Sequence, residues 1–281
     1  MKITKIKSNA KLNLALNVTG KKKALHKIES IISFIDLHDI ISINQHNGNK
    51  HHISFHGQFS KNIGKKNTVD ELFKILDKQN LLDNKKFKVR IKKKIPQEAG
   101  LGGGSMNAAG ILNYLIKKKI INLKPKKIRR ICETIGSDVF LGTVSSSCVL
   151  SSDGKIKKIY NTPKFYSILV KPNFGCSTKK IYSYVRKYTK LKYSKPKKNM
   201  FDFKFLVNQK NVLEEIAIKK YPKLKKIKSF LENLNNPLLV RMTGSGSTIV
   251  GYYNSLKACK SAKAKFKRKY KNYWCVTAKT I

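Results

Sequence analysis

Apolar and polar residues alternate near the start of the chain. Over residues 9–19 every second position is apolar, namely Ala10, Leu12, Leu14, Leu16 and Val18. A period of two predicts a β-strand with an apolar back. Lys11 and Asn13 then project together from its polar front. A turn or loop is expected over residues 20–26.

A second stretch rich in β-formers covers residues 28–43, with an interruption predicted near His38-Asp39. Residues 44–66 are polar and contain four histidines, His46, His51, His52 and His56. A metal cluster is one interpretation, but their spacing matches no standard site and no cysteine or carboxylate is near. A solvated hairpin is the interpretation that the pattern favours.

The remainder of the first half predicts helices on both sides of a glycine-rich segment. A capping box at Thr68 opens one helix, and alternation over residues 87–95 predicts a strand that leads into the glycines. A helix follows to about Ile116, and another runs from Pro125 to a stop at Gly136. A hairpin is expected over residues 145–159.

The second half has the order β-α-α-α-β-β-α-β, with a strand at 165–171 and two helices over roughly 202–233. This order predicts an antiparallel sheet covered by helices. With a boundary near residue 160, we expect an α+β chain of two domains, residues 1–160 and 161–281.

Residues 100–104 carry four glycines between a strand-like and a helix-like run. Glycine at this density lets backbone N–H groups approach a ligand, and Ser105 is expected to cap the helix that follows. Free N–H groups at a positive helix end bind an anion, most often a phosphate. A P-loop is excluded because no lysine ends the segment, and a dinucleotide fingerprint lacks its last glycine. A mobile glycine linker is the alternative.

Composition limits the class of protein. Lys and Arg number 61 against 15 Asp and Glu, a net charge of +46. Such a charge attracts polyanions, although lysines scattered over every element also fit compositional drift. The five cysteines match neither a zinc site nor a disulfide framework, so free thiols in a reducing compartment are expected. Without a signal peptide or a membrane-spanning run, we expect a cytoplasmic enzyme or binding protein.

Three motifs together resemble the GHMP kinase family. They are Ala-Lys-Leu-Asn-Leu at 10–14, the glycine-rich loop with its helix start at 96–109, and Met-Thr-Gly-Ser-Gly-Ser at 242–247. Their order spans nearly the whole chain. The resemblance implies a two-domain kinase fold with the active site in the interdomain cleft. The N-terminal α/β domain would be similar to a ribosomal-protein domain, and the C-terminal domain to a ferredoxin-like antiparallel sheet with helices.

Within the family, the chain resembles kinases that act on a cytidine diphosphate substrate in isoprenoid precursor biosynthesis. The residues that carry this likeness are His26 ahead of Ile28-Glu29-Ser30-Ile31, Gly136-Ser137-Asp138-Val139, and Ser177-Thr178-Lys179. The likeness implies ATP-dependent phosphorylation of a substrate hydroxyl group, with ATP and Mg²⁺ as cofactors.

The resemblance also implies roles for single residues. Asp138 would take or orient the proton of the attacking hydroxyl, and Lys11 would keep Asp138 ionised. Positions that match the ATP site are Asn67, Lys94, Pro96, Gly100, Leu101, Gly102, Gly103, Gly104, Ser105 and Met106. Positions that match the substrate site are Asn13, His26, Thr178, Tyr182, Gly244 and Ser245. No protein ligand to a metal is assigned.

The chain departs from the family pattern at three positions. Leu25 replaces the usual aromatic residue before the histidine, Met106 replaces a second serine of the loop, and Phe140 replaces a proline. Another family member, such as a homoserine or mevalonate-type kinase, is the first alternative, and a basic nucleic-acid-binding protein is the second. We expect no membrane partner, no specific nucleic acid, and either a monomer or a homodimer.

Overall fold

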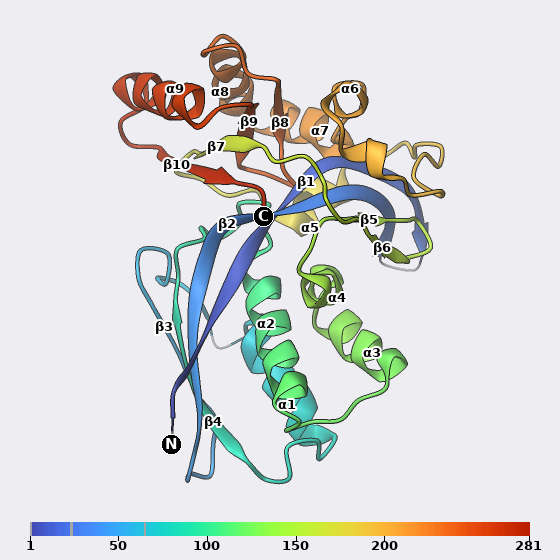
Figure 1. The fold of residues 1–281 in the computed structure, drawn as a ribbon, viewed down its shortest axis with the longest axis vertical. Helices are drawn as coiled ribbons and strands as arrows, with labels where there is room; N and C mark the ends of the chain where they lie inside the picture. The colour runs from blue at the N-terminus through green and yellow to red at the C-terminus, as the bar shows by residue number, and fades with distance from the viewer. Residues whose placement is uncertain (1, 23–24, 65) are drawn as a thin grey trace. The chain divides into compact units, whose positions relative to one another are not determined.

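A computed structural model describes residues 2–22, 25–64 and 66–281 (Figure 1). Contacts divide the chain into two compact units. The first consists of Met1–Ala10, Leu37–Gln97 and Gly102–Ser145, and the second of Lys11–Asp36, Glu98–Leu101 and Ser146–Ile281. The units interleave along the chain, and the domain boundary near residue 160 stays a prediction.

Two long strands, β1 (Thr4–Lys22) and β2 (Leu25–His46), run through both units. β1 follows the predicted alternation, but both of its faces are buried over most of its length. Of the turn expected over residues 20–26, positions 23 and 24 lie outside the described residues, and the others belong to these strands. Strand structure is therefore longer here than the sequence pattern predicts.

In the first unit, β2 pairs antiparallel with β4 (Lys86–Lys92), and β4 pairs in parallel with β3 (His52–His56). The predicted interruption at His38-Asp39 is wrong, because β2 continues through both residues. The solvated hairpin over 44–66 is also wrong, since β3 takes β4 as its partner. The apolar residues Ile53 and Phe55 of β3 pack against the core, which explains this pairing.

Four helices complete the first unit: α1 (Thr68–Lys78), α2 (Gly103–Lys117), α3 (Pro125–Ile135) and α4 (Ser137–Val144). Figure 1 shows them in cyan and green. Their apolar faces and the strands share one core, which includes Ile41, Phe73, Val89, Leu112, Cys132 and Val139. The helix predicted to begin with a cap at Thr68 is instead capped by Asn67, whose side chain accepts hydrogen bonds from the N–H groups of Val69 and Asp70.

The second unit contains a four-stranded antiparallel sheet in the order β10-β7-β9-β8. Its strands are β7 (Tyr166–Lys171), β8 (Leu239–Met242), β9 (Ile249–Tyr253) and β10 (Trp274–Lys279). The hairpin predicted over 145–159 is confirmed as β5 (Cys148–Leu150) paired with β6 (Ile156–Lys158), and β5 also pairs with β2.

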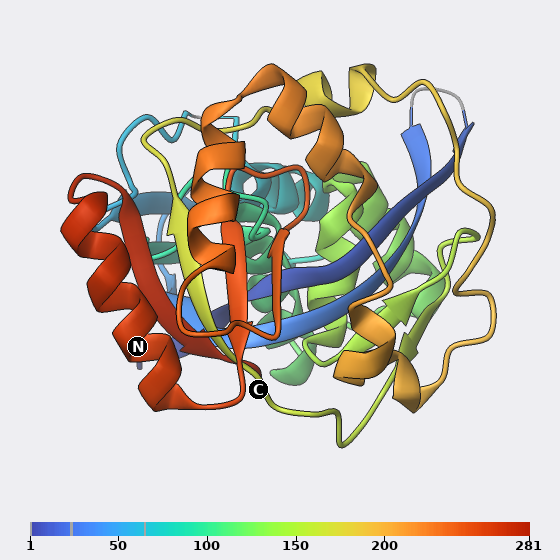
Figure 2. The same ribbon diagram turned by 90° about the horizontal axis from the view of Figure 1, so that it is seen from above.

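The helices of the second unit are α5 (Thr178–Ser183), the 3₁₀ helix η1 (Lys198–Phe201), α6 (Phe203–Leu206), α7 (Val212–Lys220), α8 (Lys223–Glu232) and α9 (Leu256–Lys269). Figure 2 shows α8 in orange and α9 in red over the sheet, as the predicted helix-covered arrangement requires. The span predicted to hold two helices, 202–233, holds three. The shared core includes Leu16, Ile168, Leu213, Ile227, Ile249 and Phe266.

All five cysteines are free and buried. Within the described part of the chain, no helix is long and apolar enough to cross a membrane.

Candidate active site

Two polar residues of β1, Lys11 and Asn13, are buried in the second unit, where side-chain hydrogen bonds hold them. The side chains of Lys11 and Asn13 are almost fully buried, with 4% and 3% exposed. The Lys11 ammonium donates to Asn13 Oδ1 at 2.5 Å, and Asn13 Nδ2 donates to Ser30 Oγ at 2.8 Å. Because both ends of the amide are engaged, Asn13 orients the lysine predicted to act in catalysis.

The glycine loop, residues 96–106, bends through left-handed backbone at Gly100 and Gly102, each with φ near 72°. A Cβ atom on Gly100 would lie 2.0 Å from the carbonyl oxygen of Thr243. A Cβ atom on Gly244 would lie 2.9 Å from the carbonyl oxygen of Gly100. Backbone therefore meets backbone where the loop passes the 243–247 turn, and only glycine fits at that contact.

Ser105 does not cap α2, contrary to the sequence prediction. The cap position is occupied by Gly102, which has no side chain to bond the helix N–H groups. Ser105 lies one residue before Met106, whose N–H makes the first bond of the helix, to the carbonyl oxygen of Gly102. The N–H groups of Gly103, Gly104 and Ser105 precede that bond, so the helix itself offers them no acceptor. They suit an anion such as a phosphate.

Three other residues predicted to contact ATP have defined places in the first unit. Asn67 caps α1, and Lys94 is exposed while its backbone N–H bonds to Asp39. Met106 is buried, and its sulfur would lie 3.1 Å from a Cβ atom on Gly142 of α4. The methionine that replaces the usual serine therefore fills space between α2 and α4. Pro96 and Leu101 are buried.

The 243–247 turn brings predicted substrate residues together. Ser245 Oγ and Thr178 Oγ1 lie 2.9 Å apart, which is within hydrogen-bonding distance. Asn211, a residue that sequence reasoning missed, donates from Nδ2 to the carbonyl oxygens of Met242 and Gly244 at 2.8 and 2.7 Å. The signal available in the sequence was an asparagine, a preferred cap residue, directly before the helix α7.

Aromatic rings surround His26. The ring centroids of His26 and Tyr182 are 5.2 Å apart, and those of His26 and Tyr188 are 6.5 Å apart. Both ring pairs are tilted. Burial, and then the charge of Lys21, hold the pKa of His26 below its ordinary value, which favours the neutral imidazole. Leu25 is 69% exposed, and Tyr188 is a second aromatic ring near His26.

Asp138 lies in the first turn of α4, directly after the end of α3. A carboxylate is favoured there by the positive end of the helix. Asp138 belongs to the first unit and Lys11 to the second.

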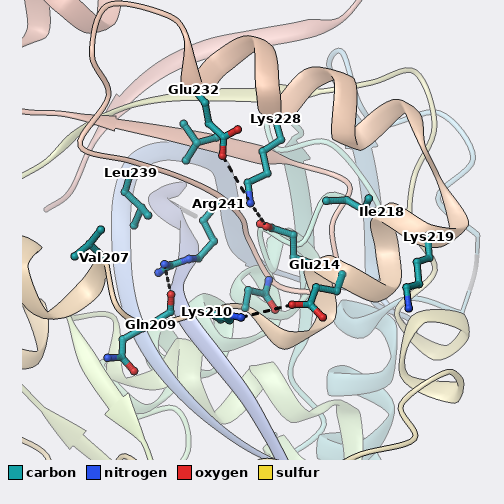
Figure 3. Close-up of a pocket in the computed structure, with 13 residues that line it drawn as sticks. Val207, Gln209, Lys210, Glu214, Ile218, Lys219, Lys228, Glu232, Leu239 and Arg241 are labelled. Atoms are coloured by element: carbon teal, nitrogen blue, oxygen red, sulfur yellow. Dashed lines mark hydrogen bonds and ion pairs between the residues drawn. The ribbon is translucent and has the colours of Figure 1, made fainter.

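A pocket of about 630 Å³ lies elsewhere in the second unit (Figure 3). Several of its charged side chains form ion pairs: Lys228 with Glu214 and Glu232, and Lys210 with Glu215. Figure 3 shows the contacts of Lys228 with Glu214 and Glu232 as dashed lines. Since no residue predicted to bind ATP or substrate lines it, this pocket is separate from the predicted site.

Among the described residues, no group of three or more His, Cys, Asp and Glu side chains is placed to hold a metal ion.

Comparison with known proteins places this geometry in a family. The model for the GHMP kinases N terminal domain matches residues 67–149, and that for GHMP kinases C terminal matches residues 193–272. The chain is 56% identical to the 4-diphosphocytidyl-2-C-methyl-D-erythritol kinase of Pelagibacter ubique over 99% of both chains. It is 32% identical to the protein of that name from Clostridium perfringens, over 95% of this chain and 94% of the relative.

A crystal structure of 4-(cytidine 5'-diphospho)-2C-methyl-D-erythritol kinase has the same fold, with a TM-score of 0.79 and 21% identity. It covers 98% of this chain and 99% of its own. The α+β kinase fold expected from the motifs is thereby confirmed, and the chain belongs to the GHMP kinase family.

Proposed function

We propose that the chain transfers the γ-phosphoryl group of ATP to the 2-hydroxyl group of 4-diphosphocytidyl-2-C-methyl-D-erythritol, a step of non-mevalonate isoprenoid precursor biosynthesis. The observation that carries the proposal is the 56% identity, over 99% of both chains, to a curated kinase named for that substrate. ATP as phosphate donor follows from membership of the GHMP kinase family.

Phosphoryl transfer is mainly positioning and charge stabilisation. A bond forms between the substrate oxygen and the γ-phosphorus, the bond to the bridging oxygen of ADP breaks, and the hydroxyl proton goes to Asp138. Lys11, held by Asn13, would stabilise negative charge on the reacting oxygens. The free N–H groups at the start of α2 would bind the ATP phosphates.

The substrate would be held by residues of the second unit. The hydroxyl pair of Thr178 and Ser245 offers hydrogen bonds to a sugar or a phosphate. His26 and Tyr182 offer a ring surface and ring nitrogens to a base. The lowered pKa of His26 keeps a neutral imidazole available as both donor and acceptor near neutral pH.

Mg²⁺ fits these residues as an ion that arrives with ATP. It would be held mainly by phosphate oxygens and water, and Ser105 at the start of α2 offers one protein hydroxyl oxygen. When bound, it neutralises charge on the phosphates. This effect adds to that of the positive N-terminal end of α2.

The test is phosphorylation of the cytidyl substrate by the purified chain, followed by mass spectrometry of the product and by coupled detection of ADP. We expect one phosphate added for each ADP released, and a kcat about 10²–10⁴-fold lower in Asp138→Asn. Equal rates for the two proteins would reject Asp138 as the base. Homoserine and mevalonate serve as control acceptors, and a chain that prefers either would overturn the proposed substrate.

Binding of ATP at rising salt separates this function from nucleic-acid binding. Counterion release makes non-specific binding of polyanions fall steeply with salt. We expect the affinity for ATP to survive moderate salt. Its disappearance would argue against a built nucleotide site.

A further inference from the structure

Asp39 lies beside both ends of the glycine loop. Its side chain is 0% exposed, and it sits on β2 just beyond the last residues that pair with β4, Ile40 and Lys92. The residues that contact its carboxylate all belong to the first unit. This carboxylate has no role in the proposed phosphoryl transfer.

One carboxylate oxygen holds the chain where it enters the loop. Asp39 Oδ1 accepts the backbone N–H groups of Lys94 at 2.7 Å and of Ile95 at 2.9 Å. Two N–H donors on a single charged oxygen fix the backbone direction there, because bonds to an ionised acceptor are roughly twice as strong as neutral ones. Residue 95 is the last before the loop.

The other oxygen holds the chain where it leaves the loop. Asp39 Oδ2 accepts Asn107 Nδ2 at 3.1 Å and pairs with the ammonium of Lys93. Asn107 is on α2 directly after the loop, and its own Oδ1 is buried with no hydrogen-bond partner among the described residues. The amide of Asn107 is therefore oriented by Asp39.

Lys93 also lies beside the residue at which α2 begins. A Cβ atom on Gly103 would lie 3.3 Å from Lys93 Nζ and 3.0 Å from Ile95 Cγ2. Gly103 is the first residue of α2, whose N–H groups would bind phosphate. Lys93 and Ile95 therefore lie beside the helix start and leave no room for a side chain at residue 103.

We propose that Asp39 is a positioning residue that joins the entry and exit of the glycine loop and thereby sets the affinity for ATP. The inference rests on the proposed function in that the loop binds the triphosphate. Asp39 touches neither ATP nor substrate and acts through the backbone at 94–95 and through Asn107. A small misplacement of groups that position a substrate can lower the reaction rate up to about 100-fold. We therefore expect the loss of the Asp39 carboxylate to have a measurable effect.

The first variant is Asp39→Asn. Its Oδ1 still accepts the two backbone N–H groups, but its new amide group faces two other donors, the Lys93 ammonium and the Asn107 amide. We expect the KM for ATP to rise about 10- to 100-fold, with the KM for the alcohol acceptor within about twofold of wild type. The dissociation constant of a non-hydrolysable ATP analogue, measured by calorimetry, rises in parallel.

Glu29→Gln is the matched control. Glu29 is also a 0% exposed carboxylate that accepts two backbone N–H groups, from Lys192 at 2.8 Å and Tyr193 at 3.3 Å, but it lies in the second unit. We expect it to lower the melting temperature without changing the dissociation constant of the ATP analogue. If Asp39→Asn behaves in the same way, the carboxylate is only structural and the proposal is overturned.

Asn107→Ala serves as a second variant in case Asp39→Asn does not fold. It keeps the ion pair and the two backbone bonds and removes only the link to α2. We expect about a fivefold rise in the KM for ATP, and an unchanged KM would overturn the link between the two ends. Binding of the analogue needs no acceptor, so it still tests Asp39 if wild type fails to phosphorylate the cytidyl substrate and the proposed function falls.

Discussion

The backbone N–H of Asn13 donates to the side-chain oxygen of Thr243 at 3.0 Å, across 230 positions of the chain. The same hydroxyl donates to the carbonyl oxygen of Gly100 at 3.4 Å. One threonine side chain therefore joins the β1 motif, the glycine loop and the 243–247 turn.

We predict that Thr243→Val lowers both stability and activity. Valine keeps the shape but leaves the buried N–H of Asn13 without its acceptor, which costs about 1–3 kcal/mol of the free energy of unfolding. The kcat/KM falls about tenfold or more, since Asn13 orients Lys11. Thr243→Ser keeps the hydroxyl and should retain most of both quantities in denaturant unfolding and in steady-state kinetics. Equal losses in the two variants would contradict a role for the hydroxyl.

Asn211→Ala removes more than a helix cap. Asn211 Oδ1 caps α7 by accepting the N–H of Leu213, while Nδ2 bonds to the carbonyl oxygens of Met242 and Gly244. We expect a loss of about 2–4 kcal/mol in the free energy of unfolding, from one cap and two buried carbonyl groups.

Ser255→Ala is the comparison for Asn211→Ala. Ser255 caps α9 by accepting the N–H of Ala258 and makes that bond at an exposed site. Its loss should cost about 1 kcal/mol by chemical denaturation. Similar costs for the two alanine variants would show that the bonds of Asn211 to the turn contribute nothing.

Tyr188 should contribute to recognition of the cytidine base under the proposed function. It is 50% exposed beside His26, where Tyr182 forms the other aromatic neighbour. Tyr188→Ala is expected to raise the KM for the cytidyl substrate about 5- to 100-fold, the value of one stacked base, and to leave the KM for ATP unchanged.

Tyr188→Phe keeps the ring and should behave as wild type. Tyr184→Ala is the matched control, because Tyr184 contacts Lys220 on α7, where Lys220 Nζ lies 4.0 Å from the ring centre. A Tyr188→Ala protein with wild-type kinetics would show that the ring does not meet substrate.

His51 predicts a pH dependence of stability. Its Nδ1 accepts the N–H of Phe87 at 3.1 Å, and its Nε2 lies 3.1 Å from Asp77. Burial lowers the pKa of His51 below its ordinary 6.5, although Asp77 opposes this shift. The unfolded chain therefore takes up a proton first as the pH falls below 6.5, so the free energy of unfolding declines on the acid side and is constant above it.

We expect His51→Gln to flatten this decline when urea unfolding is followed between about pH 8 and pH 5. His52→Gln is the control, since His52 is exposed on the neighbouring position of β3. If wild type and His51→Gln show parallel pH curves, the titrating group lies elsewhere.

Local patterns in the sequence predict much of the fold. β4 alternates apolar and charged residues, and its buried residues Phe87, Val89 and Ile91 are those of the predicted face. α3 begins at Pro125 and ends before Gly136, as the punctuating residues predict. The short α4 was missed because Ser137 starts it immediately after a helix stop, where a pattern of eight residues carries little periodicity.

The sequence predicts less well those residues whose partners come from distant segments. Asp39 indicated a break in a strand, because an aspartate is rare in strands. In the structure it lies within β2, where donors from residues 93–95 and 107 satisfy its carboxylate. The roles of Tyr188 and Asn211 depend on rings and carbonyl groups that no local spacing reveals. The motifs identify the glycine loop, but not the side chains that fix its shape.

The contact between Gly100 and Thr243 also bears on the order of events during synthesis. The partner residue follows 143 positions later, so the ribosome releases the glycine loop long before its neighbour exists. A nascent chain that ends before β8 has made the loop but lacks the turn against which it packs. Under the proposed function, we therefore expect nucleotide binding to be acquired late in translation, when the C-terminal sheet assembles.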